Sequence, residues 1–482
     1  MGKDRLAEFK PFFYPASIAV VGASEDRAKF GTHLLRAIQR FGFKGKLYPV
    51  NLQGKEVYGL KIYPSLAAIS GEVDLAYICI PAPAVPGMVK ECQDKGVRAV
   101  VVNTSNFSEL GTPEGKRLEA ELAGQVGKGL RLIGPNCFGI YCPAGGVTQL
   151  PGATYPRESG PVGFVSQSGG LSVEVCRLTW SYGIRLSKAV SYGNACDVTE
   201  LDILEYMAQD PETKIIAAYI EGVKNGRRFL ELVREISRKK PLVIWKGGLT
   251  PAGARATMSH TASLAGSEAV WAAVFSQTSA IRVNTLEELL DTVSALCHLP
   301  PQVDRRVAVV CGGGGTSVAA SDACERAGLE LSLPDKELQQ RLRGILGVPG
   351  SSVRNPIDTG NPFPSSAVLS GLLETLATSG QVANFIIDRL NLSSTMRRLT
   401  ESFEEVPEDP DLPDAPIRFK HRFGKPVMVV LREGGDKPEA LSRQVEMHRL
   451  RHLYLSQGIP VYPTLERAAL ALSRVIQYYR QR

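Results

Sequence analysis

Short, nearly continuous apolar runs recur along the chain, and longer segments with helical spacing of apolar residues separate many of them. Such runs are typical of strands buried in a parallel sheet. They lie at residues 17–22, 46–50, 75–80, 99–102 and 132–133, then at 161–165, 215–220 and 241–245, and finally at 307–311, 385–387 and 426–430. This alternation predicts an α/β protein built from doubly wound parallel sheets.

The runs fall into three groups, which predict domains at residues 1–150, 151–303 and 304–482. The length of 482 residues agrees with about three domains. The second and third groups share the order strand, glycine-rich turn, helix. This order indicates either an internal duplication or simply the ordinary construction of α/β folds.

Composition narrows the class of protein. Hydrophobic residues make up 44% and charged residues 22%, which is typical of globular proteins. No apolar run reaches the roughly 18 residues of a membrane span, and the first residues lack the apolar core of a signal peptide. The net charge of +7 is not clustered, so it favours a small anionic ligand over nucleic acid. We expect a cytoplasmic protein.

The nine cysteines are scattered, without a CxxC pair or a Cys/His group at metal-binding spacing. Several lie in apolar runs, so we interpret them as reduced core residues and expect no metal site. Cys137, in the tight Gly-Pro-Asn-Cys-Phe-Gly segment at 134–139, could act as a nucleophile, but no base or resolving cysteine accompanies it.

His260 is the most informative of the six histidines. Small and hydroxylated residues surround it in Ser-His-Thr-Ala-Ser-Leu-Ala-Gly at 259–266, which predicts a mobile loop. A neutral imidazole is a nucleophile near pH 7 and can accept a phosphoryl group. The alternative interpretation is an ordinary solvated loop histidine.

Two further segments fit the chemistry of His260. Glu221 ends the apolar run at 215–220, where its carboxylate could fix the tautomer of an imidazole or simply be solvated. Two hydroxyls and two glycines follow the run at 161–165, and a helix start there can direct backbone N–H groups at an anion. The residues of this turn are Ser166, Gln167, Ser168, Gly169 and Gly170.

Two other turns are ambiguous. Gly22, Ala23 and Ser24 follow the first run, at a place where α/β sheets bind phosphates, yet they lack the G-x-G-x-x-G pattern of NAD sites. They could equally form an ordinary turn. The four glycines at 312–315 could hold a phosphate or permit close packing.

Taken in order, these segments and Asn-Pro-Ile-Asp at 355–358 resemble the α subunit of NDP-forming acyl-CoA synthetases, the ADP-forming acetate–CoA ligases, over nearly the whole chain. They resemble the succinyl-CoA synthetase α subunit more distantly. The resemblance implies a Rossmann-like CoA-binding domain followed by two flavodoxin-like domains. It also implies that His260 is transiently phosphorylated, that Glu221 orients it, and that residues 166–170 hold the transferred phosphate.

The resemblance further implies a CoA site at the strand ends of the first domain. Its expected residues are Gly22, Ala23, Ser24, Lys29, Asn51, Lys55, Pro81, Asn103, Thr104, Ser105 and Asn136. Two departures stand out. The family often has Val-Asn-Pro-Lys where this chain has Val-Asn-Leu-Gln-Gly-Lys at 50–55, so the resemblance implies that Lys55 takes the place of the CoA-binding lysine. Asn106 replaces a glycine near the thiol end.

This chain contains no ATP-grasp segment, so the resemblance implies a partner β subunit that binds ATP or ADP with Mg²⁺. Together they would interconvert acyl-CoA, ADP and phosphate with a carboxylic acid, CoA and ATP. A non-catalytic CoA-binding relative is the second hypothesis, and the pair of His260 and Glu221 argues against it. A third, an NAD-dependent oxidoreductase, rests only on the first turn.

Overall fold

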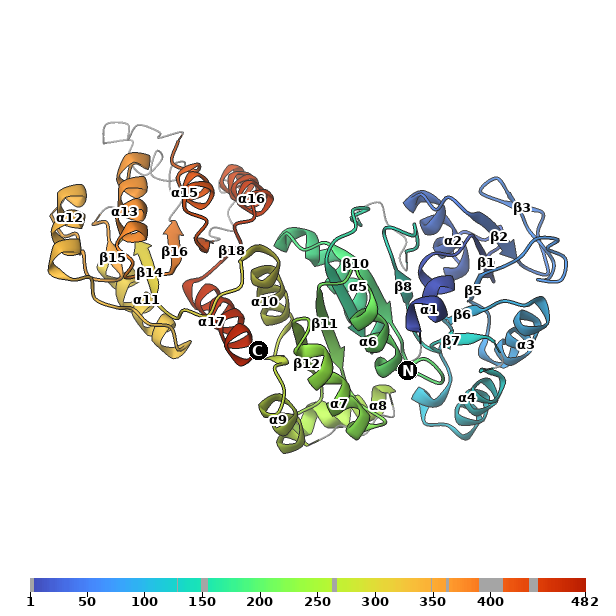
Figure 1. Ribbon diagram of the computed structural model, residues 1–482. Helices are drawn as coiled ribbons and strands as arrows, with labels where there is room; N and C mark the ends of the chain where they lie inside the picture. The colour runs from blue at the N-terminus through green and yellow to red at the C-terminus, as the bar shows by residue number, and fades with distance from the viewer. Residues whose placement is uncertain are drawn as a thin grey trace. The chain divides into compact units, whose positions relative to one another are not determined.

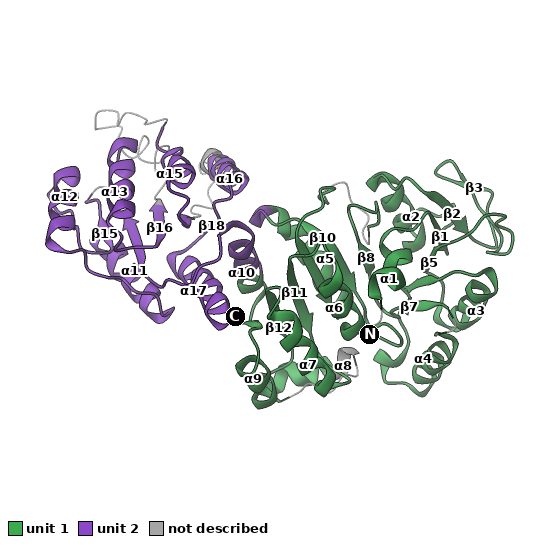
Figure 2. Cartoon of the chain, viewed as in Figure 1, with its two compact units in different colours: residues 1–180, 184–289 green, residues 181–183, 290–482 purple. Residues whose placement is uncertain are grey.

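The computed structural model describes residues 4–127, 129–148, 155–261, 267–347, 349–360, 364–389, 411–432 and 441–482. The chain divides into two compact units (Figure 2). The first comprises Met1–Trp180 with Ile184–Leu289, and the second Ser181–Gly183 with Leu290–Arg482. Apart from the two-stranded hairpin at residues 56–61, the described residues of the first unit form two sheets, and the division into three domains at the expected boundaries remains a prediction.

The first sheet is parallel, and helices pack along its buried strands (Figure 1). Its strand order is β2 (Lys46–Val50), β1 (Ser17–Val21), β5 (Leu75–Ile78), β6 (Ala99–Val102), β7 (Arg131–Ile133). The apolar runs were predicted as strands because only a sheet covered on both faces buries every side chain of a strand. The associated elements are α1 (Arg5–Phe13), α2 (Phe30–Phe41), α3 (Val85–Lys95), α4 (Pro113–Gln125), the 3₁₀ turns η1 (Ala82–Ala84) and η2 (Ser108–Leu110), and the small hairpin β3 (Glu56–Val57) and β4 (Leu60–Lys61).

The second sheet of this unit has an antiparallel strand at one edge. Its order is β13 (Ile281–Val283), β12 (Leu242–Lys246), β11 (Ile215–Ile220), β9 (Val162–Ser166), β10 (Leu186–Ser191), β8 (Gly139–Tyr141). Its helices are α5 (Gly169–Leu178), α6 (Glu200–Gln209), α7 (Gly226–Ser237), α8 (Pro251–Thr261) and α9 (Glu268–Ser276), with the 3₁₀ turn η3 (Thr179–Tyr182). Strand β8 directly follows β7 in the sequence, so the chain passes from the last strand of the first sheet to the edge strand of the second.

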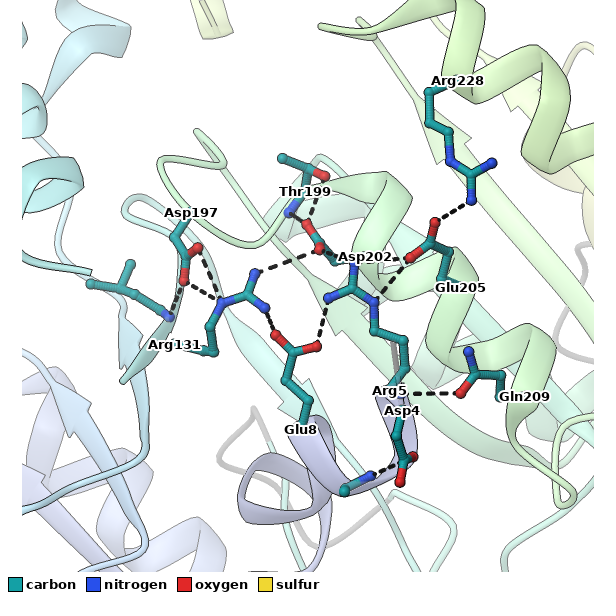
Figure 3. A network of polar contacts seen from close by, with 12 residues as sticks. Asp4, Arg5, Glu8, Arg131, Asp197, Thr199, Asp202, Glu205, Gln209 and Arg228 are labelled. Atoms are coloured by element: carbon teal, nitrogen blue, oxygen red, sulfur yellow. Dashed lines mark hydrogen bonds and ion pairs between the residues drawn. The ribbon is translucent and has the colours of Figure 1, made fainter. Parts of the chain in front are cut away.

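Ion pairs fasten the first helix to both parts of unit 1 (Figure 3). Arg5 of α1 contacts Asp202 and Glu205 of α6 at 2.6 and 2.9 Å. Arg131 of β7 contacts Glu8 of α1, and its Nε lies 2.9 Å from Asp197. Helix α1 therefore joins the first sheet to the helix that follows β10.

The second unit contains one parallel sheet. Its order is β15 (Ile357–Asp358), β14 (Val307–Cys311), β16 (Asn384–Arg389), β17 (Val427–Leu431), β18 (Val461–Tyr462). Its helices are α10 (Leu286–His298), α11 (Gly314–Arg326), α12 (Lys336–Leu346), α13 (Ser366–Thr378), α15 (Ala415–Phe423), α16 (Leu441–Ser456) and α17 (Leu465–Gln481). None of the helices in the described part of the chain combines the length and apolar character needed to cross a membrane.

All three sheets share one arrangement, which confirms the predicted α/β class. In each, the first parallel strand lies between the second and the third, at β1, β9 and β14. The strand order therefore reverses beside these three strands, and the carboxyl ends of strands at such points are where α/β sheets bind ligands. The segments singled out in the sequence, at 22–24, 166–170 and 312–315, follow these three strands.

Candidate functional site

A cavity of about 860 Å³ lies in unit 1, at the carboxyl ends of strands from both sheets. The loops after β5, β6 and β7 form one side of it, and the start of helix α5 forms another. The expected site residues that line it are Pro81, Asn103, Thr104, Ser105, Asn136, Gln167, Ser168, Gly169 and Gly170. The structure thus brings together segments that were expected to contact CoA and segments that were expected to hold phosphate.

Hydrogen bonds between strand ends shape the wall of this cavity. Asn103 Nδ2 donates to the carbonyl oxygens of Cys137 and Phe138 at 3.0 and 3.2 Å. Thr104 Oγ1 donates to the Ile80 carbonyl oxygen at 2.7 Å. Burial raises the pKa of the Cys137 thiol, which argues against the nucleophilic role considered from the sequence.

The remaining expected CoA residues lie outside the lining of this cavity. Gly22 has a φ of +97°, and a Cβ atom there would lie 2.4 Å from the Cys79 carbonyl oxygen, so only glycine allows the ends of β1 and β5 to approach so closely. Ala23 and Ser24 are buried behind this turn, while Lys29 is exposed at the start of α2.

The two residues expected from the loop after β2 lie apart from the cavity lining as well. The Lys55 backbone N–H donates to Glu25 Oε1 at 2.9 Å, which places this loop beside the β1 turn. Asn51 Oδ1 accepts a hydrogen bond from the Gln53 N–H within its own loop. Asn106, which replaces the family glycine, keeps a φ of +78° and lines the cavity.

The turn between β9 and α5 presents a helix N-terminus to the cavity. Ser168 caps the helix by accepting the Leu171 N–H at 3.3 Å, and Ser166 Oγ donates to the Ser168 carbonyl oxygen at 2.7 Å. A Cβ atom at Gly170 would meet nothing within 4 Å, so the backbone there is open to a ligand. The orientation of the N–H groups and the helix dipole favour an anion at this point.

Gln167 makes a contact that was not expected from the sequence. Its Oε1 accepts hydrogen bonds from the backbone N–H groups of Glu221 and Gly222, both at 3.0 Å. Gln167 thereby ties the turn after β9 to the end of β11, although it also lines the cavity. The side chain of Gln167 thus positions the backbone of Glu221, and the expected role of residues 166–170 toward phosphate stays a prediction.

Glu221 is buried, with 5% of its surface exposed. Burial together with the charge of Glu221 raises the pKa of Tyr219. His260 lies in the last turn of α8, but its side chain is outside the described part of the structure. The contact between His260 and Glu221 therefore stays a prediction.

The segment around His260 differs in part from the expected loop. Helix α8 continues through Thr261, so residues 259–261 are helical, because the Ala-rich sequence before them carries the helix onward. Residues 262–266 lie outside the described residues. Helix α8 packs against η2, which carries the cavity residue Leu110. The backbone that bears His260 therefore runs beside the cavity wall.

Two buried ionisable groups of unit 1, one of them beside Glu221, were not identified from the sequence. Burial lowers the pKa of Lys246, at the end of β12, to about 8, while the charge of Glu221 opposes this shift. Burial raises the pKa of Glu200, at the start of α6, to about 7. The only sequence signal for Lys246 is a lysine that directly ends an apolar run.

Across the described residues, no three His, Cys, Asp or Glu side chains are grouped so as to hold a metal ion.

Comparisons with known proteins agree with this arrangement. A family described as "CoA binding domain" matches residues 16–143, and one described as "Succinyl-CoA ligase like flavodoxin domain" matches residues 159–296. The chain is 36% identical to the α subunit of acetate–CoA ligase (ADP-forming) I of Pyrococcus furiosus over 476 residues, which cover 97% of this chain and 96% of that protein.

Two further relatives extend this result. The chain is 36% identical over 351 residues to the ADP-forming acetate–CoA ligase of Methanocaldococcus jannaschii, covering 73% of this chain and 49% of that protein. A solved structure, the dinucleotide-forming acetyl-coenzyme A synthetase 1 of Ca. Korarchaeum cryptofilum in complex with phosphate and ADP, superposes with a TM-score of 0.82 at 32% identity and covers 98% of this chain and 97% of its own. The chain therefore belongs to the family of ADP-forming acetate–CoA ligases, the NDP-forming acyl-CoA synthetases.

Proposed function

We propose that this chain is the α subunit of an ADP-forming acyl-CoA synthetase, which interconverts acyl-CoA, ADP and phosphate with a carboxylic acid, CoA and ATP. The observation that carries the proposal is the cavity that joins the strand ends of the CoA-binding sheet to the open N-terminus of α5. A thioester held at the strand ends and a phosphate held at the N-terminus of α5 would meet within this cavity. Family membership supports the same chemistry.

The first step is attack of phosphate on the thioester carbonyl carbon. A phosphate oxygen forms the new C–O bond, the C–S bond breaks, and CoA leaves as a thiolate that takes up a proton. The N-terminus of α5 at Gly169 and Gly170 stabilises the negative charge on the phosphate oxygens. The product is an acyl phosphate.

The second step passes the phosphoryl group to His260. The lone pair of one imidazole nitrogen forms the N–P bond as the P–O bond to the acyl group breaks, and the carboxylate leaves with the electron pair. Glu221 accepts a hydrogen bond from the other ring nitrogen and so fixes the reactive tautomer. ADP then takes the phosphoryl group from His260.

The nucleotide site belongs, in this proposal, to a partner. We assign ADP, ATP and their Mg²⁺ to an ATP-grasp β subunit, because several relatives carry α-subunit names and the structural relative holds ADP and phosphate. The nine cysteines are free thiols, which supports a reducing compartment such as the cytoplasm.

Labelling with radioactive phosphate tests this function. In one arm, the chain is incubated with acetyl-CoA or longer acyl-CoA thioesters and labelled phosphate. In the other, it is incubated with γ-labelled ATP and an ATP-grasp protein of the same genome. We expect acid-labile label on His260 in at least one arm. His260→Ala removes the label, whereas His421→Ala, at an exposed histidine in unit 2, leaves it unchanged.

Two outcomes contradict the proposal. One is the absence of label in both arms. The other is full turnover by His260→Ala. Tight CoA binding without label would instead support the non-catalytic CoA-binding relative.

A further inference from the structure

Lys246 is a buried cation at the carboxyl end of strand β12. Only 5% of its surface is exposed. Its ammonium group donates to the Gly247 carbonyl oxygen and lies 5.5 Å from the centre of the Trp271 ring. The register of the sheet pairs Lys246 with Ile220, the residue before Glu221. A buried lysine and a buried glutamate thus stand at the ends of neighbouring strands.

The segment that carries His260 begins directly after Lys246. Gly247 and Gly248 form the turn, and α8 starts at Pro251. A Cβ atom at Gly248 would lie 2.4 Å from Oγ1 of Thr257 in α8, so this turn packs closely against the helix. Lys246 therefore lies at the base of the segment that presents His260 and next to the strand that presents Glu221.

Burial of a charged ammonium group is unfavourable unless nearby charges compensate for it. One carbonyl oxygen and one aromatic ring compensate only partly. The negative charge of Glu221 is the charge that favours the protonated form of Lys246. Conversely, a cation at Lys246 attracts the carboxylate of Glu221 at a position with little access to water.

We propose that Lys246 is a positioning residue of the phosphohistidine site, which holds the Glu221 carboxylate in place for its hydrogen bond to His260 and offsets the charge of the arriving phosphoryl group. This proposal rests on the proposed function, since it requires His260 to be the phosphoryl acceptor. Lys246 acts through Glu221 and does not itself touch the reacting atoms.

Other side chains lie around the Lys246 ammonium group. Tyr219 and Glu221 lie at the end of the neighbouring strand β11, and Trp271 of α9 provides an uncharged ring. Tyr192 and Glu200 are close enough to interact with each other, and Glu221 also acts on Tyr192. Because burial lowers the pKa of Lys246 to about 8, Lys246 loses its charge as the pH rises through that value. Labelling of His260 should then decline at higher pH.

The test measures the initial rate of His260 labelling against pH, in whichever arm labels the wild-type chain. Lys246→Met lowers the rate by about 10²-fold, the range seen when a preorganised electrostatic group is lost. Lys246→Arg keeps the charge, recovers most of the rate and moves the decline to higher pH, since a guanidinium does not lose its proton in this range.

Lys240 provides a matched control at the opposite end of the same strand. It is also partly buried, and its Nζ donates to the carbonyl oxygens of Met207 and Asp210, both at 2.8 Å. Lys240→Met should lower thermal stability but leave the labelling rate and its pH profile unchanged. A Glu200→Gln variant shows whether Glu200, rather than Lys246, sets the pH profile.

The possible results separate the two proposals. If the wild-type chain is labelled and a folded Lys246→Met is labelled at the same rate, the proposal for Lys246 is wrong and the proposed function stands. The proposal for Lys246 is equally wrong if Lys240→Met and Lys246→Met lose rate equally, or if Lys246→Arg is as slow as Lys246→Met. If the wild-type chain takes up no label in either arm, the proposed function fails and the proposal for Lys246 fails with it.

Discussion

The second and third sheets share a strand order, but they use the polar groups at their carboxyl ends differently. Beside the second sheet, burial shifts the pKa of Glu200 up to about 7 and that of Lys246 down to about 8. At the third sheet, the two buried carboxylates are held by fixed donors. Asp358 Oδ1 accepts the N–H groups of Gly313 and Gly360, at 2.7 and 2.9 Å.

The second of these carboxylates has a charged partner. Asp388, at β16, forms a two-point contact with Arg432, at 3.2 and 2.6 Å. Such paired geometry neutralises a buried charge with fixed donors. The edge of the second sheet thus keeps groups that change protonation near neutral pH, whereas the edge of the third sheet keeps groups whose charges are already satisfied.

The glycine turns of the two sheets differ as well. Gly169 packs against the Phe138 ring, which a Cβ atom would approach to 2.6 Å. Cβ atoms at Gly313, Gly314 and Gly315 would meet nothing within 4 Å, so close packing, one of the two interpretations of this turn, does not explain these glycines. Gly313 has a φ of +106°, which does require glycine. Phosphate binding at this turn remains a prediction.

Among the variants that test this contrast between the two sheets, we expect the largest effect from a change at Gln167. Replacing it with Met removes the acceptor for the backbone N–H groups of Glu221 and Gly222 and displaces the carboxylate. We expect turnover to fall by about 10²- to 10³-fold, as for loss of a preorganised polar group. Steady-state assays of acyl-CoA formation measure this. Ser317→Ala, in the first turn of α11 after the glycine turn of the third sheet, is the control, and an equal loss there would contradict the contrast.

Arg432→Met tests whether the third sheet depends on paired charges. It leaves Asp388 buried without its cation, and we expect the free energy of unfolding of unit 2 to fall by about 2 kcal/mol. This is less than for a fully buried pair, because 40% of the Arg432 side chain is exposed. Urea denaturation measures the change, and adding Asp388→Asn should recover most of it. A loss below about 0.5 kcal/mol would mean that the pair is only a surface contact.

Glu200→Gln tests whether the raised pKa of a buried carboxylate beside the second sheet affects stability. The folded-state pKa of Glu200, about 7, is above its ordinary 4.5, so folding disfavours the ionised form. Stability is therefore lost as pH rises from about 4.5 to 7 and remains lost above that. We expect Gln to raise the free energy of unfolding by about 1 to 2 kcal/mol at pH 8 and to change it little at pH 4. A benefit that is independent of pH would contradict this explanation.

The smallest effect concerns the two glycine turns. Gly169→Ala forces the Phe138 ring to move and should cost about 1 kcal/mol. Gly314→Ala has open space at a helix start and should gain about 0.5 kcal/mol. Melting temperatures measured by calorimetry on both variants show whether the signs are opposite.

The α/β class was predictable because most strands are uninterrupted apolar runs. Strand β10 was not, since Leu186–Ser191 includes two serines and a lysine. Lys188 is fully buried there and pairs with Asp210 and Glu212, at 2.9 and 2.6 Å. A pattern of apolar positions cannot reveal a strand whose polar side chain is compensated by residues more than twenty positions away. The short strands β8, β13, β15 and β18 were missed because they offer too few residues for a pattern.

Candidate site residues could be singled out from the sequence where they end apolar strands or form glycine turns, as Glu221 and residues 166–170 do, and their roles remain predictions. The tie from Gln167 to Glu221 and the position of Lys246 beside the end of β11 were not. They depend on which strands are neighbours in the sheet, and a linear sequence does not contain that order. Burial itself, which shifts the pKa values of Lys246 and Glu200, is likewise a property of the folded chain.

Helix α1 has a consequence for how this chain can be divided. The match to the CoA-binding family begins at residue 16, after the helix ends. Yet the ring centres of Phe9 and Phe13 lie 5.2 and 4.7 Å from the ring centre of Tyr206 in α6, which also receives the ion pairs of Arg5. A fragment that starts at residue 1 and stops after the first sheet would expose these rings to solvent. The two modules of unit 1 are thus interlocked by their first helix, and a fragment that keeps either module without this helix loses contacts that the helix makes with it.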